Sequence, residues 1–137
     1  MKLKSLKSLK WLFLGVDVGF IVYWTITLFH LIPPQFLFED YNNPLLVAWN
    51  WSFFPLDLII SATGLSSLYL RKKRHPLWQS LALTSLVLTF CSGLQAIAFW
   101  VIRVEFNPVW WIPNLFLLIY PLFYIPQFVK PVMQQKD

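Results

Sequence analysis

The chain has 137 residues, a length that fits one small domain, and 58% of them are hydrophobic. Only 12% are charged, about half of the ~25% found in soluble domains, so the composition excludes an ordinary water-soluble fold. The net charge of +5 does not indicate a nucleic-acid partner, because the basic residues stand in short blocks between apolar runs, a pattern typical of membrane orientation signals.

Four apolar segments follow one another along the chain, at residues 11–32, 45–70, 77–102 and 109–129. Each is long enough to supply the ~20 residues that a membrane-spanning helix needs. Backbone groups in lipid must be satisfied within the segment, and strand-like alternation is absent, so helices are favoured. The sequence therefore predicts a single domain over residues 1–137, an all-α integral membrane four-helix bundle with up-down-up-down topology.

Basic residues are distributed unequally between the two ends of this predicted bundle. They occur at the N-terminus, in the second connection and in the C-terminal tail, at Lys2, Lys4, Lys7, Lys10, Arg71, Lys72, Lys73, Arg74, Lys130 and Lys136. The first and third connections hold only Arg103 among basic residues. Positively charged segments stay in the cytoplasm, so we predict a multi-pass protein of the cell membrane with both termini cytoplasmic.

The second apolar segment carries an acid near its middle, within "WNWSFFPLDLIIS" at residues 49–61. An ionised Asp57 at the membrane centre would cost about 2.5–3.5 kcal/mol. The carboxyl group is therefore expected to be protonated or to take hydrogen bonds inside the bundle. An intramembrane carboxyl group is a functional-site hypothesis by default, although polar residues also link neighbouring helices.

Other polar residues within or at the ends of the spans lie at depths from which a shared site with Asp57 is expected. We predict that five of them converge with Asp57 on one cavity, with Phe54 and Trp51 as apolar walls: Asn50, His30, Gln95, Asn114 and Tyr124. Such a cavity suits a lipid or a hydrophobic small molecule. If the six side chains instead point to separate helix contacts, they serve only to join helices.

Two further features concern helix packing. Asp17 lies seven residues from Lys10, and we expect it to take part in a local or interhelical ion pair, outside the cavity. Ser85, Thr89, Ser92, Gly93 and Ala96 share one face of the third segment, which predicts a close approach of another helix.

Residues for metal or cofactor chemistry do not form a recognisable set in the sequence. The two histidines, His30 and His75, are expected on opposite sides of the membrane, so they would not share a metal or haem within one monomer. A glycine-rich phosphate loop and a nucleophile elbow are also lacking. We therefore predict no metal and no cofactor, and assign no catalytic residue.

The segments "DVGFIVYW" at residues 17–24 and "FEDYNNPLLVAWNWSFFPLDLIIS" at 38–61 resemble the YvaD-like family of small bacterial membrane proteins. This resemblance covers most of the chain and implies a four-span fold in the inner or plasma membrane of a bacterium. It implies no activity.

A weaker resemblance is to the EXPERA superfamily, which includes the emopamil-binding sterol isomerase and the sigma-two receptor. It involves "TITLFH" at 25–30, "NPLLVAWNWSFFPLDL" at 43–58 and "IYPLFYIP" at 119–126. It implies a membrane-buried pocket with Asp57 as the acid of the second helix. His30 stands where that superfamily often has an acid, which puts isomerase activity in doubt.

The favoured function is non-catalytic, the binding of a lipid or hydrophobic small molecule around Asp57. The first alternative is an EXPERA-like lipid isomerase with Asp57 and His30 as proton donor and acceptor, which needs two titratable groups in one cavity. The second is an accessory subunit or small transporter that works as a homo-oligomer, which needs an exposed polar or small-residue helix face.

Overall fold

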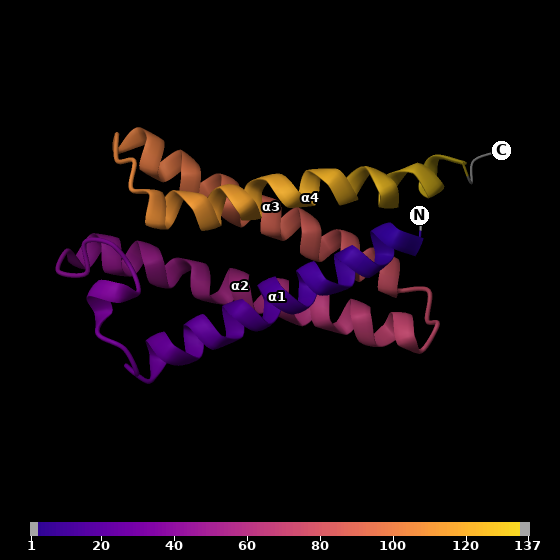
Figure 1. Cartoon of the computed structure of the whole chain (residues 1–137), viewed down its shortest axis with the longest axis horizontal. Helices are drawn as coiled ribbons and strands as arrows, with labels where there is room; N and C mark the ends of the chain where they lie inside the picture. Colours follow the sequence, from indigo (N-terminus) through magenta and orange to yellow (C-terminus); the bar gives the residue numbers. More distant parts are fainter. Residues whose placement is uncertain (1–2, 135–137) are drawn as a thin grey trace.

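The computed structural model describes residues 3–134, and its main elements are four long helices joined by short connections (Figure 1). The elements are α1 (Leu3–Leu28), the short 3-10 helix η1 (Pro34–Phe36), α2 (Pro44–Lys72), α3 (Trp78–Ile102) and α4 (Pro108–Gln134). α1 packs against α2, α2 against α3, and α3 against α4. The prediction of an all-α, up-down-up-down bundle is confirmed.

All four long helices are long and apolar enough to cross a membrane. Large apolar side chains point outward on each of them, including Trp11, Ile59, Leu94 and Phe123. A helix that is apolar all round needs lipid as its outer solvent, so these outward faces fit an integral membrane bundle.

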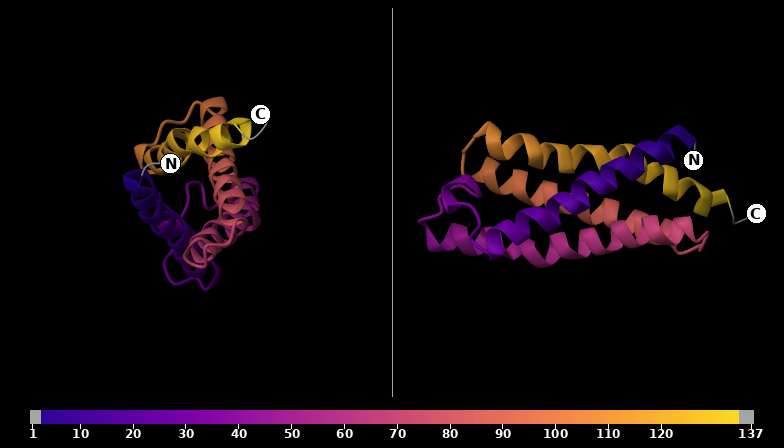
Figure 2. Two further views of the ribbon diagram at one scale, coloured as in Figure 1. Left: turned by 90° about the vertical axis from the view of Figure 1, so that its right-hand side faces the viewer. Right: turned by 60° about the horizontal axis from the view of Figure 1, so that its bottom comes forward.

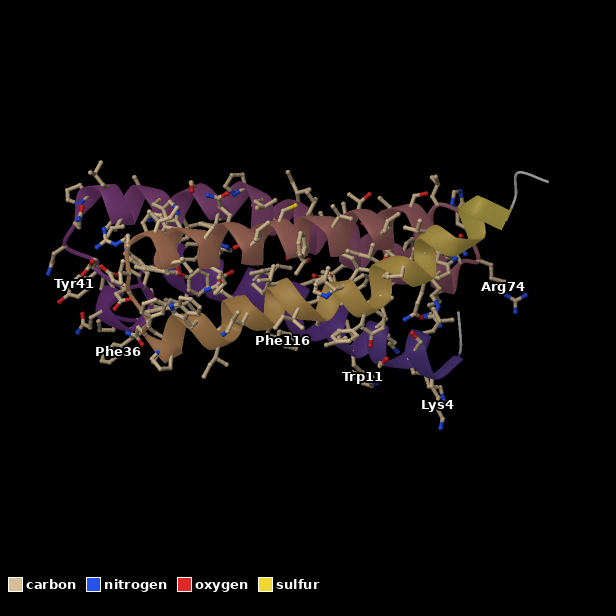
Figure 3. The ribbon with its side chains drawn as sticks, turned by 90° about the horizontal axis from the view of Figure 1, so that it is seen from above. Lys4, Trp11, Phe36, Tyr41, Arg74 and Phe116 are labelled. Carbon is tan, nitrogen blue, oxygen red and sulfur yellow. The ribbon has the colours of Figure 1, made fainter. Side chains whose placement is uncertain are left out.

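The two ends of the bundle differ in what they carry. Both termini lie at one end, which we call the termini end; the opposite end, formed by residues 29–43 and 103–107, is the loop end (Figure 1). Figure 3 shows Lys4 and Arg74 at the termini end and Phe36 and Tyr41 at the loop end. Of the basic residues counted for orientation, Lys2 and Lys136 lie outside the described residues.

α1 and α4 are close together at the termini end and separate toward the loop end (Figures 1 and 2). At the termini end, the Ser5 hydroxyl donates to Gln127 Oε1 at 2.7 Å, and the Ser8 and Tyr124 hydroxyls are 2.8 Å apart. Toward the loop end, α1 follows α2 while α4 stays beside α3. The hydrogen bonds between α1 and α4 therefore belong to the half nearer the termini.

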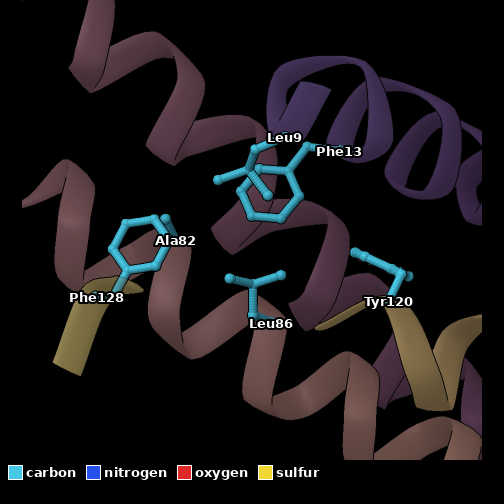
Figure 4. Packing of buried hydrophobic residues seen from close by; sticks show 6 residues of the cluster. All are labelled: Leu9, Phe13, Ala82, Leu86, Tyr120 and Phe128. Carbon is cyan, nitrogen blue, oxygen red and sulfur yellow. The ribbon is translucent and has the colours of Figure 1, made fainter. Parts of the chain in front are cut away.

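The half nearer the termini is filled by an apolar cluster. Figure 4 shows its six residues, contributed by α1, α3 and α4: Leu9, Phe13, Ala82, Leu86, Tyr120 and Phe128. Phe13 and Leu86 are almost fully buried. Well-filled cores leave few voids larger than a water molecule, so space for a ligand is expected in the other half.

The small-residue face of α3 is buried, as predicted, and brings α4 close. A Cβ atom on Gly93 would stand 2.5 Å from the backbone nitrogen of Leu118 and 2.8 Å from the carbonyl oxygen of Asn114. Cβ atoms in proteins essentially never come so close to other atoms, so the approach of α3 and α4 at this point depends on the glycine at residue 93.

α1, α2 and α3 end in the same hydrogen-bonded motif. In each, a residue with left-handed backbone follows the helix, namely His30 (φ 50°), Arg74 (φ 57°) and Val104 (φ 56°). The next backbone N–H then donates back to the carbonyl five residues earlier, as from Glu105 to Trp100 at 3.1 Å. This is the Schellman motif, in which glycine usually takes the left-handed position.

The first helix differs from the predicted span of 11–32. It begins at Leu3 and ends at Leu28, because the turn at His30 and the prolines that follow it stop the helix. His30 therefore lies in the connection and is exposed, not on the helix.

Candidate functional site

A cavity of about 310 Å³ lies in the loop half of the bundle. All four long helices and the first connection contribute to its wall, which is mostly aromatic and aliphatic. Its main apolar lining residues are Phe20, Leu46, Trp49, Phe53, Trp100 and Trp110. The α2 contributors Leu46, Trp49, Asn50 and Phe53 follow the spacing of one helix face.

Four polar side chains line the same cavity: Tyr23, Glu39, Asn50 and Asn114. The Asn114 amide donates to the carbonyl of Trp110 on its own helix, at 2.7 Å. By contrast, Asn50 Nδ2 and Glu39 Oε2 are buried and have no hydrogen-bond partner among the described residues. A buried polar atom without a partner is costly, so each is available to a bound molecule.

The Tyr23 hydroxyl fixes two elements at the cavity wall. It lies 3.2 Å from the carbonyl oxygen of Leu37 and 3.3 Å from Asn50 Oδ1. The first of these contacts ties the connection between α1 and α2 to α1. Tyr23 thereby joins α1, α2 and this connection at one point of the cavity.

Asp57 does not line the cavity but lies deeper in the bundle, almost fully buried. Its Oδ2 accepts a hydrogen bond from the Trp24 indole Nε1 at 2.9 Å, and its Oδ1 accepts one from the Ser92 hydroxyl at 3.4 Å. The expected hydrogen-bonded carboxyl group inside the bundle is therefore present. Trp24 in turn packs edge-on against Tyr23, with ring centroids 5.0 Å apart.

The six residues expected at one cavity are not all brought together. Asn50 and Asn114 line the cavity, while Asp57 lies behind its wall. His30 and Gln95 are exposed, one in the connection after α1 and the other on the outside of α3. Tyr124 lies at the termini end, with its hydroxyl beside Ser8. The prediction that all six share one cavity is wrong.

Trp51 and Phe54, expected as cavity walls, pack instead around Trp24. Their ring centroids lie 5.3 Å and 5.2 Å from that of Trp24. The cavity takes the neighbouring aromatic residues Trp49 and Phe53, which project from the adjacent strip of the same helix. The face of α2 that lines the cavity is therefore shifted by about one residue from the face that the sequence predicted.

Asp17 also differs from its expected role. Its side chain is fully buried, and neither carboxyl oxygen has a hydrogen-bond partner among the described residues. The ion pair expected for Asp17 is therefore absent from that part of the chain, and Lys10 is exposed. The carboxyl group faces α2, where Gly64 leaves space for it.

Sequence reasoning missed the contribution of the first connection. Two of its apolar residues pack inward: Leu37 is buried and Phe38 lines the cavity. Glu39 follows them into the wall, where its Oε1 accepts a hydrogen bond from Asn107 Nδ2 at 3.1 Å. The apolar triplet Phe36–Phe38 directly before two acids was the available signal that this segment folds back onto the bundle.

Charged residues bridge the two connections at the loop end. Arg103 pairs with Asp40 at 3.3 Å and with Glu105 at 2.6 Å, and the Trp111 indole donates to the Glu105 carbonyl at 2.8 Å. The hydrogen bond with Glu105 raises the pKa of the Arg103 guanidinium above its ordinary value, so the group stays charged. These contacts hold the first connection over the loop end of the cavity.

Comparison with known proteins places the chain in one family. Residues 9–135 match the family described as "Family of unknown function (DUF5360)". The chain is similar to "Uncharacterized protein YvaD" of Bacillus subtilis (strain 168), with 51% identity over 132 residues, which cover 96% of this chain and 99% of that protein. No solved structure matches. The chain therefore belongs to the DUF5360 family, as the resemblance to YvaD-like proteins implied.

Proposed function

We propose that this protein binds a lipid or a hydrophobic small molecule in the cavity of the loop half. The observation that carries the proposal is the cavity itself, about 310 Å³ in volume, with aromatic walls and two buried polar atoms that lack partners in the described part of the chain. Ligand sites typically combine an apolar lining with a few polar groups that orient the ligand.

Asp57 supports this site from behind, as a positioning residue. Its Oδ2 accepts the hydrogen bond of the Trp24 indole, and Trp24 packs against Tyr23, which lines the cavity. A buried indole N–H needs an acceptor, and Asp57 supplies it. We infer that Asp57 fixes the aromatic wall and does not itself contact the ligand.

Access from the lipid phase is favoured by the arrangement of the helices. α1 and α4 separate toward the loop end (Figure 1), and residues of both helices line the cavity. Val109, on α4, belongs to the lining and is also 67% exposed, so it stands at the rim. A hydrophobic ligand would enter between α1 and α4 without crossing water.

We further infer that the protein lies in the plasma membrane of a bacterium with both termini in the cytoplasm. The termini end carries Lys4, Lys7, Lys10 and the block Arg71–Arg74, whereas Arg103 is the only Lys or Arg at the loop end of the described chain. The positive-inside rule then assigns the loop end, and the cavity, to the outer leaflet.

Blocking the rim of the cavity tests the binding proposal. Val109→Trp would place an indole at the entrance, and Ile112→Trp is the matched control, since Ile112 is on the same helix, is also 67% exposed and does not line the cavity. We expect a hydrophobic molecule to co-purify with the wild type and with Ile112→Trp, and to be lost from Val109→Trp. Native mass spectrometry would measure it.

Equal ligand occupancy in the wild type, Val109→Trp and Ile112→Trp would refute binding in this cavity.

Asp57→Leu gives a second test, because it removes the acceptor of the Trp24 indole. We expect it to lower occupancy through disorder of the aromatic wall, while Asp57→Asn keeps an acceptor oxygen and keeps most of the occupancy.

A further inference from the structure

We propose that the cavity selects amphiphiles whose head group donates hydrogen bonds and carries no negative charge, such as long-chain amines or alcohols. This inference rests on the proposed binding function and assigns the chemical class of the ligand. It comes from two polar atoms of the cavity wall, Asn50 Nδ2 and Glu39 Oε2, for which the described residues supply no hydrogen-bond partner.

Glu39 determines the first requirement. Its Oε1 is occupied by the amide of Asn107, but its Oε2 is buried and has no partner among the described residues. An ionised carboxyl oxygen accepts hydrogen bonds and donates none. A ligand that satisfies Oε2 must therefore bring an O–H or N–H group to this part of the cavity.

Asn50 is compatible with an alcohol head group in either orientation of its amide, and with an ammonium head group when the amide is turned. With Oδ1 toward Tyr23, its unpartnered Nδ2 would donate to a ligand oxygen, as an alcohol provides. The Tyr23 hydroxyl has one proton for two nearby acceptors, the Leu37 carbonyl and Asn50 Oδ1. If the amide is turned, Nδ2 donates to Tyr23, and the free oxygen accepts from an alcohol or an amine.

Charge at the loop end sets the second requirement. The two connections there carry three acids, Glu39, Asp40 and Glu105, against the single base Arg103. Arg103 pairs with Asp40 and Glu105 and not with Glu39, so no ion pair neutralises Glu39 within the described residues. Like charges repel, so a carboxylate head group is disfavoured beside Glu39.

Three amphiphiles with the same chain length test the selectivity. The purified protein would be placed in phosphatidylcholine nanodiscs, which carry no net lipid charge, and titrated with radiolabelled dodecylamine, dodecanol or dodecanoate. The amount of amphiphile that partitions into the bilayer is measured with nanodiscs that contain the Val109→Trp protein, and this background is subtracted. We expect the amine and the alcohol to bind at least about tenfold more tightly than the carboxylate, as the loss of one charge-assisted hydrogen bond predicts.

Glu39→Gln removes the charge while preserving the size of the side chain. We expect it to reduce the preference for dodecylamine over dodecanoate by about tenfold. Asp40→Asn is the matched control, because it removes one charge from the neighbouring residue, which does not line the cavity, while its amide oxygen can still accept from Arg103; the preference should be preserved. An equal effect of both variants would mean that general charge, not Glu39, sets selectivity, and would overturn the inference.

The outcomes separate the two proposals. Equal binding of all three amphiphiles, or tighter binding of dodecanoate, would overturn the head-group inference while the cavity remained a binding site. If none of the three binds above the Val109→Trp background, the proposed function fails, and the inference fails with it.

Discussion

The carboxyl group of Asp17 occupies the space that a side chain on residue 64 would need. A Cβ atom built on Gly64 would collide with Asp17 Oδ2 and would lie 2.9 Å from the Ser85 hydroxyl. Asp17 is fully buried, and the neighbouring Ser61 hydroxyl donates to its backbone carbonyl at 2.9 Å. The contact between α1, α2 and α3 at this depth therefore depends on a glycine opposite a buried acid.

Gly64→Ala should lower the free energy of unfolding by about 1–3 kcal/mol, because the added methyl group displaces Asp17 in a packed interior. Gly19→Ala is the matched control: a Cβ there meets nothing within 4 Å, so we expect no loss of stability. Unfolding in mixed detergent micelles would measure both.

The pair can also be tested by a double-mutant cycle. Asp17→Ala removes the group with which the methyl group added by Gly64→Ala would collide. The combination of the two changes should therefore cost less than the sum of the single changes, by about 0.5–3 kcal/mol. Additive effects would contradict the contact.

The hydrogen bonds of Asp57 give a second prediction. Asp57→Asn keeps an oxygen that accepts from the Trp24 indole, so stability should change little. Asp57→Leu leaves that indole without an acceptor and should cost about 1–3 kcal/mol. Thermal unfolding of the purified protein would compare them. If Asn proves as damaging as Leu, the group needs a negative charge and the hydrogen-bond account is wrong.

Orientation in the membrane gives a third prediction. With Cys91 replaced by serine, a cysteine at Asn42 in the first connection should react with a membrane-impermeant maleimide added to intact cells. A cysteine at Lys73 should react only after permeabilisation, because the basic block at 71–74 holds this turn in the cytoplasm. Labelling of position 73 in intact cells would reverse the proposed topology.

The sequence was sufficient to predict the four helices because hydropathy and length decide what crosses a membrane. It was also sufficient to place Asn50 and Asn114 at one depth. The distance to Tyr124 could have been calculated too: ten residues from Asn114 correspond to about 15 Å along a helix, too far for one small cavity. Gln95 was misplaced because it lies about 100° around α3 from the buried Ala96.

Glu39 could not be placed from the sequence by periodicity, because it stands in a connection. Its position depends on tertiary contacts: Leu37 is buried, its carbonyl lies 3.2 Å from the Tyr23 hydroxyl, and Asn107 on the other connection donates to Glu39. The apolar triplet at 36–38 indicates that the segment folds back onto the bundle, but no local pattern specifies which residues it then contacts. The residue that we assign to ligand selectivity was therefore visible only once the fold was known.

The left-handed turn at Val104 gives the last prediction. A β-branched residue at φ 56° is strained, and the left-handed conformation costs roughly 1–2 kcal/mol for residues with a Cβ atom. Val104→Gly should therefore raise the free energy of unfolding by about 1 kcal/mol, since the Schellman bonds from Val104 to Val101 and from Glu105 to Trp100 use only the backbone.

Val101→Gly, within α3, is the control and should lower the free energy of unfolding by a similar amount. Because Val104 lies outside the cavity lining, ligand occupancy in Val104→Gly should match the wild type. A loss of stability in Val104→Gly would mean that the valine side chain contributes contacts that outweigh the backbone strain.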